Sequence, residues 1–191
     1  MKASASYLRT VKDVLSQEPR VLSVPLTIFI DKHGRPFRIC RWGTRDFERL
    51  VEMYVNFEPK SQAGGLPPVD EPRIRAWLEK LTSQGLNLIA KDKSQIVAHA
   101  VLSPIGEREA EVAVFVHQGF QGLGVGHKLV SCLVTIANLK NFEKVWGLVE
   151  SENSTIIHIN HSLGFSTYRI SQGSVEMELK LHERKSESNS P

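Results

Sequence analysis

The stretch from Ala110 to Val130, AEVAVFVHQGFQGLGVGHKLV, constrains the fold more than any other part of the sequence. A continuous apolar run is followed by a turn rich in Gly and Gln, and this turn leads directly into a segment with helical periodicity. Backbone N–H groups in such a turn and at a helix start have no partner within the helix, and the helix dipole adds partial positive charge. Gly122, Gly124 and Gly126 allow a close approach to this backbone. The junction therefore predicts a binding site for an anion such as a pyrophosphate.

Two familiar phosphate-binding motifs do not fit this turn. A Walker loop ends in Gly-Lys-Ser/Thr, whereas neither Gly124 nor Gly126 is followed by a lysine. A dinucleotide-binding fingerprint needs its third glycine where His127 stands if it starts at Gly122, and where Leu129 stands if it starts at Gly124. Both kinds of site are therefore excluded here.

The pattern that does fit is Gln121-x-x-Gly124-x-Gly126. It resembles the acetyl-CoA signature, Gln/Arg-x-x-Gly-x-Gly/Ala, of the GNAT superfamily of N-acyltransferases. The context is similar as well, because a preceding strand, a following helix, a further strand, a helix opened by Asn153 and a Leu-Gly-Phe ending occur in the family's order. The resemblance covers about Arg38 to Leu181 and implies a GNAT-like fold.

Hydrophobic periodicity and turn residues predict the other elements. Helices are expected at about 4–17, from Thr44, and at about 73–83, 122–140 and 153–162; strands are expected at 24–30, 36–42, 86–90, 96–102, 110–116, 145–149, 165–170 and 175–181. Glu58–Pro72 is rich in Gly and Pro and is expected to be a loop. Because a structureless segment of this length in a compact domain usually serves a function, the loop is expected to lie over the acceptor site. Consecutive strands imply antiparallel pairing, and the strand–helix–strand unit implies one parallel crossover. The expected fold class is α/β (α+β), with a mixed, mostly antiparallel sheet and helices on both faces.

Composition narrows the class of protein. One domain is expected over 23–181, with an N-terminal helical extension over 1–22 and a disordered polar tail over 182–191. The net charge of +3 is too small to indicate a nucleic-acid partner. Cys40 and Cys132 form no metal-spaced pair, and His158 and His161 have no acidic helper nearby, so no metal site is expected. The start of the chain lacks a signal-peptide core, and no segment approaches the roughly 20 apolar residues that cross a membrane, so a cytoplasmic protein without a membrane partner is expected.

The resemblance implies where acetyl-CoA, the cosubstrate, binds. In this family the strand before the signature diverges from its neighbour, and its freed backbone groups bind the pantetheine arm. Here those groups belong to Val114, Phe115 and Val116. Asn153, first of all a helix N-cap, and Asn160 are further implied contacts. The pyrophosphate is expected on the turn and the first helical turn, which comprise Gln121, Gly122, Leu123, Gly124, Val125, Gly126 and His127.

Glu111 is the expected catalytic residue. It stands near the start of the same strand, and several protein-acetylating members of the family have a glutamate there as general base. A lysine amine with a pKa of about 10.4 must lose a proton before it attacks a thioester, which costs roughly 4 to 5 kcal/mol at neutral pH. A carboxylate can accept that proton directly or through water. The alternatives are that Glu111 is a solvated charge beside Glu107 and Glu109, and that His117 is the base.

The resemblance is weaker at the general acid. Many members have a tyrosine four residues before the glycine of the Leu-Gly-Phe ending, where this chain has Asn160. Tyr168 is a candidate substitute, although a strand residue packed on the sheet is the simpler interpretation. A thiol leaving group with a pKa of about 8.5 needs only about 2 kcal/mol of help from protonation at neutral pH, so a hydrogen bond from Asn160 to the sulfur or the pantetheine is the alternative.

The resemblance implies an N-acetyltransferase that moves the acetyl group of acetyl-CoA directly onto an amine. The position of Glu111 and the missing tyrosine are more similar to the bacterial protein lysine acetyltransferases than to antibiotic- or polyamine-modifying branches, so a protein lysine is the expected acceptor. A small-molecule amine is the close alternative. A non-catalytic acyl-CoA-binding regulatory module, favoured by the missing tyrosine, is the rival from another class. The oligomeric state stays open, with a homodimer among the alternatives.

Overall fold

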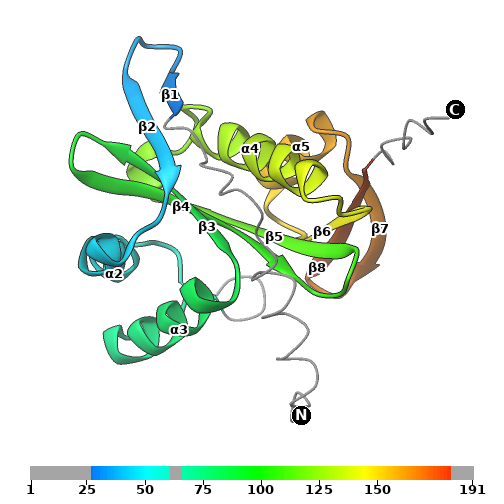
Figure 1. Ribbon diagram of the computed structural model, residues 1–191, viewed down its shortest axis with the longest axis horizontal. Coiled ribbons are helices and arrows are strands. Elements are labelled where there is room, and N and C mark those ends of the chain that lie inside the picture. The colour runs from blue at the N-terminus through cyan, green and yellow to red at the C-terminus, as the bar shows by residue number, and fades with distance from the viewer. Residues whose placement is uncertain (1–26, 61–65, 182–191) are drawn as a thin grey trace, which may run out of the picture.

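One mixed sheet forms the centre of the computed structural model, which describes residues 27–60 and 66–181 (Figure 1). Eight strands in these residues follow the order β1-β2-β3-β4-β5-β6-β8-β7. Every neighbouring pair is antiparallel except β5 with β6, so the expected mixed, mostly antiparallel sheet is confirmed. The strand bounds are β1 Thr27–Ile30, β2 Pro36–Arg41, β3 Leu86–Asp92, β4 Gln95–Pro104, β5 Glu109–Val116, β6 Lys144–Glu150, β7 Ser166–Ser171 and β8 Ser174–Lys180. The helix expected at 4–17 and the tail expected at 182–191 lie outside the described residues.

Helices cover both faces of the sheet, as expected. In Figure 1, α4 and α5 lie on one face, and α2 and α3 lie on the other. Short 3-10 turns precede α2 and the glycine-rich turn. The bounds are η1 Thr44–Asp46, α2 Phe47–Val55, α3 Glu71–Gln84, η3 Gln118–Phe120, α4 Val125–Leu139 and α5 Ser154–Ser162. None of the described helices has the length and apolar character that a bilayer-spanning segment requires.

Each pair of helices buries its own apolar cluster against the sheet. Leu129 of α4 belongs to the larger cluster, while Leu50 of α2 and Ile74 of α3 belong to the smaller one. Side chains alternate along β5, so Val112 packs into the larger cluster and Phe115 packs against the smaller one. The sheet therefore separates two apolar layers, and β5 contributes to both.

Two helix starts differ from the expected ones because of local backbone geometry. Thr44, expected to be an N-cap, instead opens η1, whose N-cap is Gly43. α4 begins at Val125 instead of near Gly122, because Gly122 and Gly124 have φ angles of 72° and 81°, which a helix does not accommodate.

The start of α3 lies inside the segment expected to be a loop. Asp70 accepts a hydrogen bond from the backbone N–H of Arg73 at 3.0 Å and is the N-cap. Pro72 fits the first helical turn, where its missing N–H is not needed. The loop is therefore shorter than expected, and Pro72 belongs to the helix.

Candidate active site

The strands β5 and β6 pair over a short distance and then diverge. The paired residues are Glu109 with Lys144, Ala110 with Val145, and Glu111 with Trp146. Beyond this point β6 continues along β8, and β5 continues along β4. A gap therefore opens between the two central strands, as the family resemblance implied.

The hydrogen-bond alternation of β5 decides which backbone groups face the gap. The N–H of His117 donates to the C=O of Val97, directly opposite on the next strand, at 2.9 Å. Odd-numbered residues of β5 therefore direct their N–H and C=O groups toward β4, and Val112 and Val114 direct theirs toward the gap. The prediction for the backbone of Phe115 needs correction, because its groups face β4.

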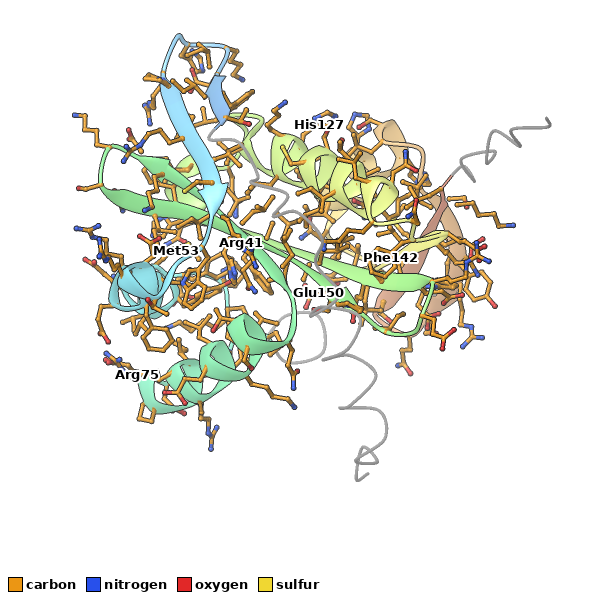
Figure 2. The ribbon with its side chains drawn as sticks, viewed as in Figure 1. Arg41, Met53, Arg75, His127, Phe142 and Glu150 are labelled. Carbon is orange, nitrogen blue, oxygen red and sulfur yellow. The ribbon has the colours of Figure 1, made fainter. Side chains whose placement is uncertain are left out.

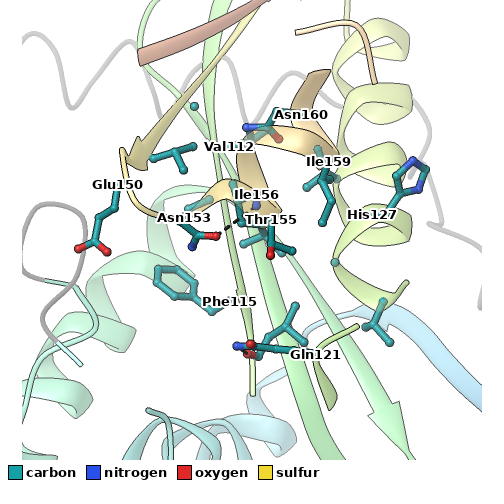
Figure 3. Close-up of a pocket in the computed structure, with 18 of the residues that line it drawn as sticks. Val112, Phe115, Gln121, His127, Glu150, Asn153, Thr155, Ile156, Ile159 and Asn160 are labelled. Atoms are coloured by element: carbon teal, nitrogen blue, oxygen red, sulfur yellow. Dashed lines mark hydrogen bonds between the residues drawn. The ribbon is translucent and has the colours of Figure 1, made fainter. Parts of the chain in front are cut away.

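A cavity of about 500 Å³ occupies the gap. Ile156 and Ile159 of α5 border it on one face of the sheet, and Phe57 and Pro67 border it on the other. The cavity therefore passes through the sheet, from the layer of α4 and α5 to the layer of α2 and α3. Figure 3 shows the side chains that line it, projecting from β5, β6, α4 and α5.

The turn between β5 and α4 presents unpaired N–H groups to this cavity. Gly124 is the N-cap of α4 and supplies no side-chain cap. The first intrahelical bond runs from the N–H of Lys128 to the C=O of Gly124, at 3.0 Å. The N–H groups of Val125, Gly126 and His127 consequently have no partner within the helix. These donors fit a pyrophosphate, with the helix dipole favouring its negative charge.

Gln121 and Leu123 differ in their relation to the cavity. Gln121 lines it, and its Nε2 donates to the C=O of Val116 at 3.0 Å, which fixes the turn to the end of β5. Leu123 does not line it, because its side chain packs against the larger apolar cluster and anchors the turn from behind. The contact expected between Leu123 and the pyrophosphate, as part of the turn, stays a prediction. The other predicted cofactor residues all border the cavity: Val114, Phe115, Val116, Gln121, Gly122, Gly124, Val125, Gly126, His127, Asn153 and Asn160.

Two asparagines of the α5 segment border the same cavity. The Oδ1 of Asn153 accepts from the N–H of Ile156 at 3.2 Å, which confirms the predicted N-cap (Figure 3). Asn160 is only 3% exposed, its Nδ2 lies 3.5 Å from the sulfur of Met177, and no described residue donates to its Oδ1. A Cβ on Gly147 would lie 3.6 Å from that Nδ2, so the glycine leaves room for the amide beside the gap. A buried amide with unused hydrogen-bonding capacity thus faces the cavity.

Glu111 lies on the wall of the cavity near the closed end of the gap. Its neighbours across the sheet are Ser103 on β4 and Trp146 on β6. The side chain stays open to solvent, and desolvation by the surrounding protein raises the pKa of its carboxyl. A carboxylate with a raised pKa is a better proton acceptor.

The alternative acid–base residues do not line the cavity. The Nδ1 of His117 accepts from the N–H of Gly119 at 3.2 Å, so this ring caps η3. Tyr168 packs edge-on against Trp146, with ring centroids 4.9 Å apart. Neither residue belongs to the described wall of the cavity. In the described part of the chain, His, Cys, Asp and Glu side chains form no group of three or more that could hold a metal ion.

Sequence reasoning placed the Glu58–Pro72 loop over the acceptor site, and Leu66 and Pro67 of that segment line the cavity. The residues it missed on this side are Phe57, Leu148 and Glu150. For β6 a signal was available, since Val145, Gly147 and Val149 are buried and the intervening residues share the opposite face. The segment after α2 offered no such periodicity.

Comparisons with known proteins agree with this geometry. The acetyltransferase (GNAT) family model matches residues 47–165. An L-methionine sulfoximine/L-methionine sulfone acetyltransferase of Salmonella typhimurium is 39% identical over 106 residues, which are 51% of this chain and 61% of the relative's length. The GNAT domain of S. lividans PAT has a TM-score of 0.73 at 20% identity, and the match covers 85% of this chain and 100% of that domain. The acetyltransferase yncA of Salmonella typhimurium, solved with acetyl-CoA, has a TM-score of 0.64 at 22% identity, with 81% and 99% covered.

Proposed function

The chain belongs to the GNAT family of acetyltransferases, and on that basis we propose that it transfers the acetyl group of acetyl-CoA to the side-chain amine of a protein lysine. The observation that carries the proposal is the position of Glu111. Its carboxylate borders a cavity that connects a phosphate-compatible turn on one face of the sheet with the opposite face.

The residues around the gap fit acetyl-CoA. The orphan N–H groups at the start of α4 would hold the pyrophosphate, and the backbone groups of Val112 and Val114 would hold the pantetheine. Asn160 would offer its buried amide to the same arm. Bound acetyl-CoA supplies a thioester, whose acyl carbon bonds to the amine nitrogen as the bond to sulfur breaks.

Glu111 would accept the proton that the amine must lose. Its raised pKa suits this role, because the carboxylate is a stronger base than an ordinary glutamate. No described lysine or arginine lines the cavity to pair with it. The carboxylate is therefore available to a cationic amine that arrives from the side of α2 and α3.

The shape of the acceptor side supports a large substrate. On that face α2 and α3 lie over the half of the sheet that holds β2, β3 and β4, and no described helix lies over β6, β7 and β8 (Figure 1). Only the lysine side chain of a protein substrate would need to enter the cavity, and the rest of that protein would stay outside. The second candidate is a small-molecule amine, favoured by the identity with the methionine sulfone acetyltransferase.

A panel of acceptors tests the proposal. Purified protein and acetyl-CoA are incubated with lysine peptides, protein extracts, amino acids and simple amines, and acetylation is read by mass shift together with release of free thiol. Acetylated lysine side chains support the proposal, and acetylation of small amines alone supports the second candidate. Binding of CoA without thiol release in any mixture would indicate the non-catalytic module instead.

A further inference from the structure

We infer that Glu150 makes the cavity select amines that carry no carboxylate beside the reacting nitrogen. The inference rests on the proposed function, since it concerns the acceptor side of the same cavity. It defines the acceptor class as a lysine side chain within a polypeptide, where the carboxylate is an amide, and it disfavours free α-amino acids.

The charges of the wall are the first argument. Among the described residues that line the cavity, Glu111 and Glu150 are carboxylates, His127 is the one other ionisable side chain, and none is Lys or Arg. The stretch 61–65, SQAGG, contains no ionisable side chain. Neither carboxylate forms an ion pair with a described residue, whereas Glu109 and Glu178 both pair with Lys144. Away from the start of α4, the described wall therefore attracts cations and has no cationic side chain to pair with an anion.

The two carboxylates share the acceptor side of the sheet. Glu111 lies opposite Trp146 in the β5–β6 ladder, and alternation along β6 places Leu148 and Glu150 on the same face as that tryptophan. His127 lies on α4, across the sheet from Glu150 (Figure 2). Figure 3 shows the same separation, with Glu150 at the end of β6 and His127 on the far side of the cavity.

The spacing of the carboxylates decides what they act on. Trp146 and Glu150 are four residues apart, which is roughly 13 Å along a strand. Glu111 thus stands at the closed end of the gap, where the amine would lose its proton, and Glu150 stands toward its open end. An acceptor that reaches Glu111 with its amine has its next atoms between the two negative charges. A carboxylate on those atoms meets repulsion from both, while an amide meets neither.

Matched acceptors test the inference. L-methionine sulfone is compared with its amide, and Nα-acetyl-L-lysine with its amide, by kcat/KM at neutral pH and low salt. We expect the wild type to favour each amide, by at least about tenfold for the methionine sulfone pair, whose carboxylate lies beside the amine. Glu150→Arg should lower that ratio at least about fivefold, because it replaces a repulsive charge by an attractive one. Glu152→Arg is the matched control, because Glu152 is exposed in the turn after β6 and does not line the cavity. The ratio of kcat/KM for the amide to that for the acid should stay within about twofold of the wild-type ratio in this variant.

Two results would overturn the inference. One is a wild-type ratio near unity for the methionine sulfone pair, and the other is an equal shift in Glu150→Arg and Glu152→Arg. The proposed function fails by different results, which are acetylation of small amines alone or no thiol release with any acceptor. The affinities of the same acid and amide for the protein–CoA complex can be measured by calorimetry without turnover. They test the role of Glu150 even if no thiol is released.

Discussion

Gln118 and Glu58 are joined across 60 residues of chain: the side-chain Oε1 of Gln118 accepts the backbone N–H of Glu58 at 3.0 Å. The Nε2 of the same amide donates to the C=O of Asn56 at 2.7 Å. Gln118 lies in η3, just before the glycine turn, while Asn56 and Glu58 follow α2 and lead toward Leu66 and Pro67 on the acceptor-side wall. One side chain therefore connects the turn that fits the pyrophosphate with the segment that borders the acceptor.

We expect Gln118→Ala to raise the KM for the acceptor by about three- to tenfold, because two hydrogen bonds of about 1 kcal/mol each no longer hold the segment in place. The dissociation constant for acetyl-CoA should change less than about twofold, since the N–H groups of α4 are untouched. Gln118→Glu keeps the hydrogen-bond acceptor for Glu58 and loses the donor to Asn56. Its KM for the acceptor substrate should therefore lie between those of the wild type and Gln118→Ala. Equal effects on both ligands would show that Gln118 does not serve the acceptor side.

Gly122 gives a charge test of the anion site. Its φ is 72°, and a Cβ there would meet no atom within 4 Å. Asn and Asp both tolerate this conformation, and they differ by one charge. We expect Gly122→Asp to weaken acetyl-CoA binding by about tenfold at low ionic strength, and Gly122→Asn by less than about threefold. Calorimetry at two salt concentrations measures both, and a similar loss in the two variants would mean that shape, not charge, matters at this position.

Glu111→Gln keeps the size of the side chain and cannot accept a proton. We expect turnover at neutral pH to fall by roughly 10²- to 10⁴-fold, with little change in acetyl-CoA affinity. In the wild type, kcat/KM should fall as the pH drops through the raised pKa of Glu111, because the protonated carboxyl is no base. The deficit of the variant should shrink toward high pH, where more acceptor arrives neutral.

Glu107→Gln, in the exposed turn before β5, is the matched control and should turn over normally. Near-normal turnover of Glu111→Gln at neutral pH would remove the general-base role. Loss of acetyl-CoA binding in that variant would make Glu111 a structural residue.

His99 should make the fold sensitive to acid. It is fully buried between the Tyr54 hydroxyl, 2.8 Å from Nδ1, and the Asn87 amide oxygen, 2.9 Å from Nε2, and burial lowers its pKa to about 3. In the unfolded chain the pKa is about 6.5, so the unfolded state binds the proton first, and stability present above pH 6.5 is lost as the pH falls toward 3. From pH 7 to pH 5 the loss attributable to His99 should be about 2 kcal/mol in urea unfolding.

His99→Gln removes this titration and should flatten the pH dependence, at the cost of a lower stability at pH 7. His158→Gln, on the exposed face of α5, should keep the wild-type slope. The assignment to His99 would be wrong if the two variants lost stability in parallel between pH 7 and pH 5.

The cofactor side was predictable because its parts are contiguous. The strand, the turn and the start of the helix lie within Ala110–Val130, so periodicity and glycine placement predicted an anion site, and the family resemblance implied acetyl-CoA there. The same stretch produced one error of detail. Ladder register, which sequence does not state, turns the backbone of Phe115 toward β4.

The acceptor side could not be predicted in the same way. It combines Phe57, Leu66 and Pro67 with Leu148 and Glu150, which come from opposite halves of the chain. They meet only because β5 and β6 diverge and α2 packs beside them, and both are consequences of tertiary packing. Alternation along β6 indicated which face Glu150 lies on, but it did not indicate that this face borders a cavity.

The passage of the cavity through the sheet has a consequence for inhibition. Two reactants that approach from opposite faces do not need to displace one another, and a single molecule can occupy both approaches at once. A conjugate in which the sulfur of coenzyme A is linked to the side chain of a lysine peptide would thread the sheet between β5 and β6. Such a bisubstrate compound should compete with both acetyl-CoA and the acceptor. It should also bind more tightly than either half alone, because once one half is bound the other binds without a further loss of translational freedom.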